Sequence, residues 1–450
     1  MIRDTEPGFP TVRNFVISLI TIFVSVGIAI AQCPEPSIGN SASVLKTVSA
    51  SVTKPAEYSI TFSAEVPGTS WVKPGAEAAV LSIFIDGRYV QDVVLFSGER
   101  SFEYRALIGK LEVGKHDISI TLNSERSAKG ARSVRIGRAR LLDLSGSSGI
   151  DLLAIQNAPF LYARANIVDK FSDIPLVTYY EVLPMADGTT AIRYSTIFTN
   201  EDGGTQTAAL MARWGRATDI EWVYEVRFRD GKRVSEIFQG ANHVTTDFKG
   251  QRIFGEHPLL TTATDNNNFA DSGCSKLRSA LLPTRVDLTK RSRESVMDVN
   301  PWSYKIMAEE AMREGRVDPA KMGANTIDDL RNYVYVDVFT ETIGAAVSVE
   351  LTTRNGVTNR SDLNDERLRM ARPGFQRIAV RIPTGATISS IKLVCHQIST
   401  SKTPGNCGRS EIGYFVSLDK DFSPRVVRPR SKIAGVLNPG EFLEWKDPKF

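Results

Sequence analysis

Apolar and polar residues alternate along most of this chain, and that two-residue period restricts the possible fold more than any other feature. From Tyr58 to Val66 every second residue is apolar, as expected of a half-buried strand. Asp86-Gly87 separates two similar runs and supplies the positive φ angles that a tight hairpin turn needs. Short strands with turns between them predict an immunoglobulin-like β-sandwich over residues 42–144.

The rest of the chain continues the β pattern, with one interruption. Between the β regions, Pro301 and Gly315 bracket a helix-forming stretch, for which Asn300 is the expected cap. We predict a mainly β, multi-domain protein with one short helix. The expected segments are a signal peptide (1–31), the immunoglobulin-like sandwich (42–144), a central β-sandwich-like domain (150–289), a helical connector (290–331), a C-terminal β region (332–423) and an extended tail (424–450).

The N-terminus has the pattern of a secretory signal peptide. Arg3 and Arg13 precede an uncharged apolar run over residues 15–31, which ends in Ala-Ile-Ala. The run is shorter than the about 20 apolar residues that span a membrane comfortably. We therefore expect cleavage before Gln32, a secreted or periplasmic protein, and no transmembrane segment after cleavage.

Export would place the four cysteines in an oxidising compartment, where disulfides are favoured. Cys395 and Cys407 flank a polar segment with Gly and Pro, which predicts a loop closed by a bridge. Cys33 and Cys274 would then pair with each other by elimination.

Several function classes lack their sequence signals. The formal net charge of +4 is small for 450 residues, so nucleic acid is not an expected partner. The chain has no Gly-x-Ser-x-Gly elbow, no phosphate-binding loop and no dinucleotide fingerprint after a predicted strand. A basic run ends the first domain, and we expect a solvated edge strand there, with attraction to an anionic surface or polysaccharide as the alternative. The run comprises Arg126, Lys129, Arg132, Arg135, Arg138 and Arg140.

The stretch Gly215 to Phe228 (GRATDIEWVYEVRF) separates two chemically opposite faces. The apolar face, which we expect in the core, consists of Ile220, Trp222, Tyr224, Val226 and Phe228. On the other face, Asp219 and Glu221 lie roughly 6.5–7 Å apart if the stretch is a strand, close enough to share a cation or a polar ligand.

Downstream loops of the same domain add further candidate ligands. His243, His257 and Asp265 follow the strand, and with Asp219 and Glu221 they form the predicted site of a divalent cation, calcium or magnesium. Charged residues opposite an apolar face are also typical of the solvated side of a sheet. That interpretation is the one we expect for Glu225 and Asp202, and it stays open for Asp219 and Glu221.

The central region resembles two known families over about residues 158–271. Gly215 to Glu221, Asn242-His243 and His257-Pro258 resemble the Gly-His-Arg-His-Asp-Trp-Glu heptapeptide and the His-Pro of necrosis-inducing, cytolytic secreted proteins. The stretch is also similar to the Gly-Asp-Trp-Glu hallmark of a vacuolar-sorting-associated family, whose members open with Ala-Pro-x-x-Tyr, here Ala158 to Tyr162.

These resemblances imply a β-sandwich and a divalent cation held by Asp219 and Glu221. Arg216 and Thr218 replace both heptapeptide histidines, and Ile220 replaces the Trp. The implied properties are therefore the metal site and the fold, without cytolytic activity.

Three functions fit these observations. The first is an exported binding protein that uses a divalent cation to engage a carbohydrate, glycolipid or envelope surface. The second is a glycan hydrolase with paired carboxylates, although neighbouring residues on one strand face the same partner rather than flank a substrate. The third is a structural or adhesive extracellular protein without a site.

Overall fold

The computed structural model describes residues 35, 43–164, 171–201 and 203–448. Within these residues the chain forms 27 strands and four α-helices, so the predicted mainly β fold class is confirmed. The predicted signal peptide, residues 1–31, lies outside the described residues, and so does Cys33 of the second expected disulfide.

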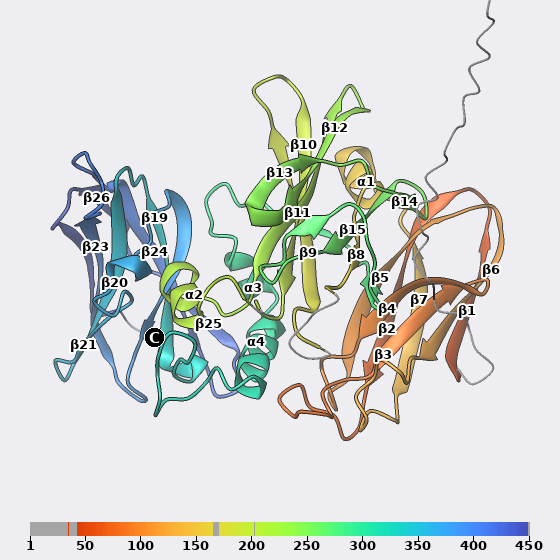
Figure 1. Cartoon of the computed structure of the whole chain (residues 1–450), viewed down its shortest axis with the longest axis horizontal. Helices are drawn as coiled ribbons and strands as arrows, with labels where there is room; N and C mark the ends of the chain where they lie inside the picture. The colour runs from red at the N-terminus through yellow and green to blue at the C-terminus, as the bar shows by residue number, and fades with distance from the viewer. Residues whose placement is uncertain (1–34, 36–42, 165–170, 202, 449–450) are drawn as a thin grey trace, which may run out of the picture. The chain divides into compact units, whose positions relative to one another are not determined.

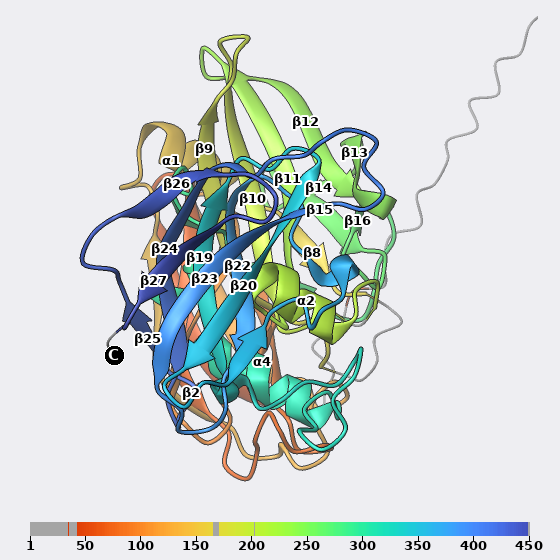
Figure 2. The same cartoon turned by 90° about the vertical axis from the view of Figure 1, so that its left-hand side faces the viewer.

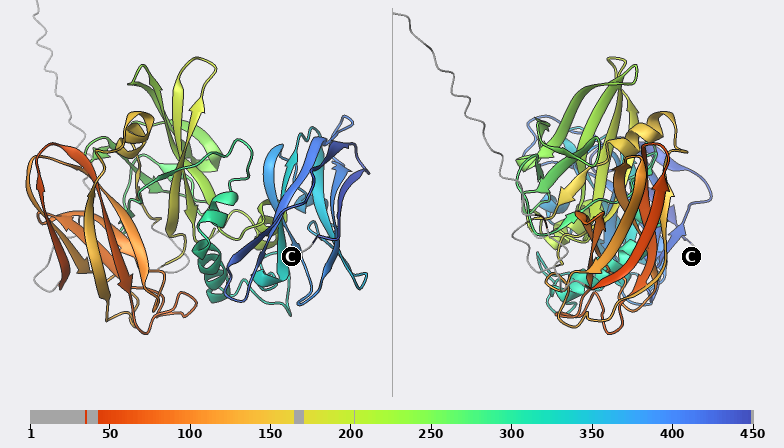
Figure 3. Two further views of the ribbon diagram at one scale, coloured as in Figure 1. Left: turned by 180° about the vertical axis from the view of Figure 1, so that it is seen from behind. Right: turned by 90° about the vertical axis from the view of Figure 1, so that its right-hand side faces the viewer.

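Two antiparallel sheets form the N-terminal sandwich (Figures 1 and 3). The first, in the order β1-β6-β3-β4, contains Val44–Val52, Gly114–Leu122, Val80–Ile85 and Arg88–Val94. The second, in the order β5-β2-β7, contains Phe102–Leu111, Ala56–Glu65 and Arg135–Asp143. Ile60 and Phe62 are completely buried, as their alternation predicts. Asp86 and Gly87 join β3 to β4 with φ angles of 50° and 82°, which confirms the hairpin turn.

The second half of the predicted basic run lies on an edge strand, β7, which pairs on one side only, with β2, whereas Arg126, Lys129 and Arg132 precede that strand. Arg135, Arg138 and Arg140 are exposed on it, and Arg135 forms an ion pair of 2.9 Å with Glu65. Positive side chains on an edge strand oppose pairing with another chain.

The central region contains a large and a small sheet (Figure 1). The large sheet, in the order β13-β12-β11-β10-β9-β18, contains Val244–Asp247, Lys232–Gly240, Ile220–Arg229, Thr190–Phe198, Pro175–Pro184 and Thr284–Arg285. The small sheet, in the order β14-β15-β8-β17, contains Arg252–Ile253, His257–Thr262, Phe160–Tyr162 and Arg278–Ser279, and β16 (Phe269–Ala270) pairs with β15.

Four α-helices are present where one was expected. They are α1 (Gly149–Gln156), α2 (Thr207–Trp214), α3 (Ser295–Val299) and α4 (Trp302–Arg313). The predicted helix is α4, but Asn300 does not cap it, since its amide donates to the Val296 carbonyl at 2.9 Å. The other three helices have eight residues or fewer, too short to establish a clear helical period in the sequence.

The C-terminal region is a second complete sandwich, whose strands face the viewer in Figure 2. One sheet, in the order β22-β19-β24-β25 with β26 on β24, contains Gly374–Arg381, Tyr333–Thr340, Gly408–Leu418, Pro424–Val427 and Ile433–Leu437. The other, in the order β21-β20-β23-β27, contains Thr358–Arg360, Ala345–Thr353, Ile388–Gln397 and Phe442–Lys446.

Two features of this sandwich bear on the sequence predictions. The Cys395–Cys407 disulfide is present, as expected from the intervening loop. The segment 424–450, for which an extended tail was expected, contains β25, β26 and β27. The strands β25 and β26 pair with β24, and β27 pairs with β23, so pairing with earlier strands orders this Pro- and Arg-rich segment.

Arg377 of β22 connects this sandwich to the helices that precede it. Its guanidinium is completely buried and lies 2.8 Å from Asp298 of α3 and 2.7 Å from Asp337 of β19. The hydroxyls of Tyr304 and Tyr414 also contact it. These two carboxyl groups and two hydroxyls compensate the buried cation and accept its hydrogen bonds.

Candidate functional site

Strand β11 lies in the middle of the large central sheet, between β10 and β12. Ile220, Tyr224, Val226 and Phe228 are buried, which confirms most of the predicted core face. Trp222, from the same predicted face, is only half-buried.

A bulge explains the position of Trp222. The pairing of β11 with β10 skips Val223, and such an extra residue interrupts the alternation of faces. Trp222 is thereby out of phase with Tyr224, and Trp222 and Glu221 both line the same pocket.

That pocket has a volume of about 300 Å³ and contains three of the five predicted site residues, Asp219, Glu221 and His243. The other two lie elsewhere. His257 is completely buried, 2.9 Å from the Ala158 carbonyl and 3.1 Å from a carboxylate oxygen of Glu57 in the N-terminal sandwich.

Asp265 also has a separate partner. One of its oxygens accepts a hydrogen bond of 2.5 Å from Arg164, which is itself 2.9 Å from Asp173. The structure therefore places His257 and Asp265 in separate polar contacts outside the pocket.

Sequence reasoning did not identify the remaining polar and aromatic side chains of the pocket. Glu201 comes from the turn after β10, Trp214 from α2 and Gln239 from β12. Arg293 precedes α3, and Arg372 precedes β22 in the C-terminal sandwich. In the sequence Glu201 precedes Asp202 within an acidic turn. That turn was the one signal that could have indicated Glu201 as a pocket residue.

Glu225 corrects another expectation. The sequence predicted a solvent-facing side chain, but Glu225 is completely buried. Its carboxylate lies 2.8 Å from both Arg193 and Arg227, on β10 and on its own strand. These two guanidinium groups cover it and compensate its charge, which explains how a strand residue opposite the core can be buried.

Three carboxyl groups of the pocket are removed from water. Glu201, Asp219 and Glu221 are only 2%, 1% and 7% exposed. Burial, with the nearby Asp219 as the second cause, raises the pKa of Glu201 to about 8. Burial likewise raises the pKa of Asp219 to about 7, with Glu221 as the second cause, while Arg216 acts in the opposite direction on both groups. Glu201 is therefore largely protonated at neutral pH, whereas Asp219 titrates near neutral pH.

Nitrogen donors contact two of these three carboxyl groups, those of Asp219 and Glu221. Asp219 accepts a hydrogen bond of 3.1 Å from the Asn267 amide, and its other oxygen lies 3.6 Å from Arg216. Glu221 accepts a hydrogen bond of 2.6 Å from the Gln239 amide.

Two acceptor oxygens lack a partner. Within the part of the chain that the structure describes, Oε1 of Glu201 and Oε1 of Gln239 form no hydrogen bond, although both residues are almost fully buried. A buried polar atom without a partner costs about 1–3 kcal/mol. Both residues line the pocket, so a donor entering it can satisfy them.

Glu294 contacts two of the guanidinium groups that line the pocket. Arg216 lies 3.2 Å and Arg293 lies 3.5 Å from the same Glu294 oxygen. Arg293 also donates to the Ile220 carbonyl at 2.6 Å, and Arg216 donates to the Thr218 carbonyl. Both guanidinium groups are thus held in place by neighbouring acceptors.

His243 adds a neutral ring. It lies 2.6 Å from the Gln239 amide and 2.8 Å from the Asn266 amide. Burial lowers the pKa of His243, and the positive charge of Arg372 lowers it further. The imidazole is therefore neutral at physiological pH and acts as a hydrogen-bonding group rather than as a cation.

The residues present do not fit a divalent cation. No group of three His, Cys, Asp or Glu side chains with a metal-binding arrangement occurs among the described residues. Asp219 faces Arg216 and Asn267, and Glu221 faces Gln239, so nitrogen donors stand where a cation would need free oxygens. Metal binding by Asp219, Glu221, His243, His257 and Asp265 stays a prediction from the sequence.

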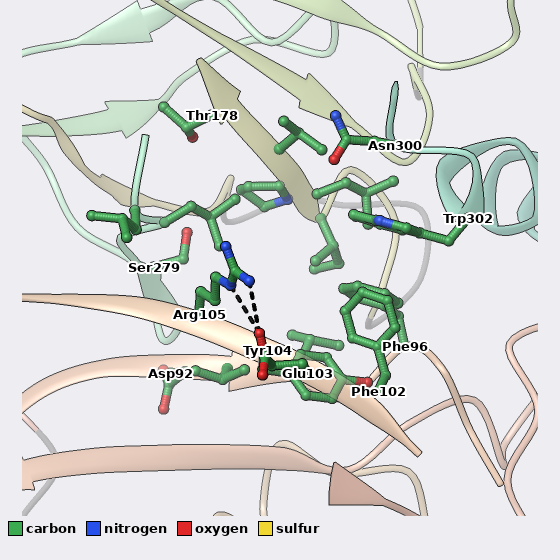
Figure 4. A pocket seen from close by; sticks show the side chains of 18 of the residues that line it. Asp92, Phe96, Phe102, Glu103, Tyr104, Arg105, Thr178, Ser279, Asn300 and Trp302 are labelled. Carbon is green, nitrogen blue, oxygen red and sulfur yellow. Dashed lines mark hydrogen bonds and ion pairs between the residues drawn. The ribbon is translucent and has the colours of Figure 1, made fainter. Parts of the chain in front are cut away.

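A second cavity, of about 390 Å³, contrasts with this pocket (Figure 4). Aromatic rings form much of its wall, with Phe96 and Trp302 stacked at a centroid distance of 5.0 Å. Its charged side chains are already paired. Arg105 donates to Glu103 at 2.8 Å, and Asp92 accepts from neighbouring hydroxyls. The side chains of this wall are therefore typical of packing between sheets.

Comparisons with known proteins leave the family open. No family model matches the chain, and no curated protein matches it. Among solved structures, it is similar to the EclA C-terminal domain, described as a sugar-binding protein, with a TM-score of 0.18, 14% identity, and coverage of 26% of this chain and 86% of that one.

A second similarity is to the M60 catalytic domain with the CBM51-1 and CBM51-2 domains from Clostridium perfringens ZmpB. The TM-score is 0.14 and the identity 11%, over 90% of this chain and 33% of that chain. Similarities this low define neither a fold family nor a function.

The described part of the chain also contains no helix with the length and apolar character needed to cross a membrane.

Proposed function

We propose that this protein is a secreted or periplasmic binding protein whose central region binds a carbohydrate in the pocket around Asp219 and Glu221. The observation that carries the proposal is the pair of buried, unpartnered acceptors, Glu201 Oε1 and Gln239 Oε1, in the wall of a pocket. Sugar hydroxyl groups can donate to such oxygens and accept from neighbouring nitrogens at the same time.

The aromatic side chains support the same class of ligand. Trp214 and Trp222 line the pocket together with its carboxyl and amide groups. An indole provides an apolar surface for the C–H face of a sugar ring, while the polar groups contact its hydroxyls. A volume of about 300 Å³ suits a single terminal sugar residue rather than a long chain in cross-section.

Export is supported by two independent features. Residues 1–31 have the charge and hydropathy pattern of a signal peptide. The Cys395–Cys407 disulfide is of a kind that persists in oxidising compartments.

A binding experiment on the full mature chain tests this function. A glycan array would select a ligand, and isothermal titration would measure its Kd. Trp222→Ala should weaken binding roughly tenfold or more, since truncation of an aromatic anchor costs about 2 kcal/mol. Phe442→Ala is the matched control, because Phe442 is an exposed aromatic on β27 outside this pocket. The proposal is wrong if the array detects no glycan, or if both variants bind like the wild type.

A second candidate function is hydrolysis of a glycan. It is favoured by the position and proton affinity of Glu201, which comes from a different element than Asp219 and Glu221. With a pKa of about 8 it retains the proton that a general acid would deliver to a leaving group. Turnover of a glycan panel, abolished in Glu201→Gln, would establish this activity; binding without turnover would leave the binding function.

A further inference from the structure

Arg372 is the one guanidinium group of this pocket that has no acceptor among the described residues. It is exposed in the segment before β22, and its guanidinium carbon lies 5.7 Å from the centre of the Trp214 ring. No hydrogen bond or ion pair joins it to another described residue, whereas Arg216 and Arg293 are held by Glu294 and by backbone carbonyls. Its donors are therefore free to bind a ligand.

Two neighbouring residues, Trp214 and Pro373, lie next to Arg372. Pro373 follows it and restricts its backbone, and Trp214 supplies a flat surface beneath its guanidinium. Its charge acts on the interior of the pocket, where it lowers the pKa of His243. Arg372 comes from the C-terminal sandwich, so the pocket contains a cation from outside the central region.

The charge balance of the pocket also favours an anion. Three guanidinium groups, those of Arg216, Arg293 and Arg372, are permanently positive. Glu294 pairs with Arg216 and Arg293, and so leaves Arg372 without a carboxylate partner among the described residues. The raised pKa values of Glu201, about 8, and Asp219, about 7, reduce the negative charge opposite these groups at pH 7.

We infer that the saccharide bound in this pocket carries an anionic substituent, a carboxylate or a sulfate, and that Arg372 binds this substituent. The inference rests on the proposed function and narrows its ligand to acidic sugars. A planar guanidinium matches the two oxygens of a carboxylate or sulfate in a way that a sugar hydroxyl does not. The sugar ring would then lie toward Trp222 and Gln239, with its acidic group at Arg372.

Three probes distinguish a carboxylate from a sulfate as the anionic substituent, and both from a neutral sugar. They are a uronic-acid oligosaccharide, the same oligosaccharide with its carboxyl groups reduced to alcohols, and a sulfated oligosaccharide. Titration of each into the full mature chain at pH 7 gives three Kd values. We expect the wild type to bind at least one acidic probe roughly tenfold more tightly than the neutral one.

The variant Arg372→Gln should remove this preference, with a roughly tenfold weaker Kd for the acidic probe and a much smaller change for the neutral one. Arg138→Gln, on the exposed edge strand β7, removes the same charge far from the pocket lining and should keep the preference. Thermal melting of both variants checks that they fold.

Each remaining result has a definite meaning. A loss confined to the uronic-acid or to the sulfated probe assigns the anionic group to that source. Equal binding of acidic and neutral probes by the wild type, or an equal loss for all probes in Arg372→Gln, overturns the inference and leaves the proposed function intact. If the wild type binds no saccharide at all, the proposed function itself fails.

Discussion

Glu201 is the residue whose behaviour differs most from its appearance in the sequence. It stands in a polar turn with Asn200, where a carboxylate would normally be solvated, yet it is only 2% exposed. Arg316 donates to its backbone carbonyl at 2.8 Å, but its Oε1 has no partner among the described residues. Burial beside Asp219 then favours the protonated, neutral form of its carboxyl group.

This protonation predicts how stability depends on pH. The pKa of Glu201 rises from 4.5 to about 8 on folding, so the folded state binds the proton more tightly. The stabilisation is complete below about pH 4.5 and is lost as the pH rises through about 8. Glu201→Gln mimics the neutral acid at every pH, so it should match the wild type at pH 4.5 and be more stable at pH 8, by about 1–3 kcal/mol.

Urea unfolding of both proteins at the two pH values provides the measurement. Glu103→Gln is a suitable control, because Glu103 is exposed and its substitution should shift stability little at either pH. An equal difference between Glu201→Gln and the wild type at both pH values would contradict the prediction.

At the scale of elements, the contact between β22 and α3 is linked through Glu294 to two arginines of the pocket. Arg377 of β22 binds Asp298 of α3 and contacts the backbone carbonyl of Glu294. Glu294 in turn positions Arg216 and Arg293 in the pocket wall. The ionic contact between the C-terminal sandwich and α3 is therefore adjacent to two of the charges that line the pocket.

Removal of this buried cation should be costly. Arg377→Met leaves Asp298 and Asp337 without their common partner, and an uncompensated buried charge costs about 3–5 kcal/mol. Chemical denaturation of the full chain measures the change. Arg409→Met on β24 breaks an exposed ion pair with Glu341 and should cost about 0–1 kcal/mol. Similar losses in both variants would show that the Arg377 contacts are not special.

At the scale of the whole molecule, the pocket is assembled from segments far apart in the chain. Glu201, Asp219 and Gln239 come from the central region, Arg293 from the segment before α3, and Arg372 from the C-terminal sandwich. Two of its three positive charges, those of Arg293 and Arg372, thus come from outside the region that supplies Glu201, Asp219 and Glu221. Ligand binding is expected to depend on the intact chain for this reason.

The same arrangement predicts the response of the protein to calcium. Nitrogen donors already face Asp219 and Glu221, so millimolar calcium should leave the Tm of the full chain unchanged. Thermal melts with calcium and with a chelator measure this, and magnesium serves as a second cation. A Tm that rises with calcium and is lowered again in Asp219→Asn would restore the metal site predicted from the sequence.

Local patterns in the sequence predicted much of the fold and less of the site. Alternation identified the buried face of β11, and the Asp86-Gly87 turn was correct, because both depend on residues close together in the chain. The short helices α1 and α2 escaped prediction for lack of a repeated period. The same alternation placed Glu221 and Glu225 on one face, but their roles depend on neighbours from other strands.

The amino-acid sequence alone was sufficient for the β class and the Cys395–Cys407 bridge, and it placed Asp219 and Glu221 close together, since these follow from local spacing and polarity. The fold was needed to separate His257 from the pocket, to bury Glu225 between two arginines, and to bring Arg372 to the pocket wall. The physical reason is that alternation indicates which face of a strand avoids water. The charge and partners of a buried group depend instead on whichever distant side chains pack against it.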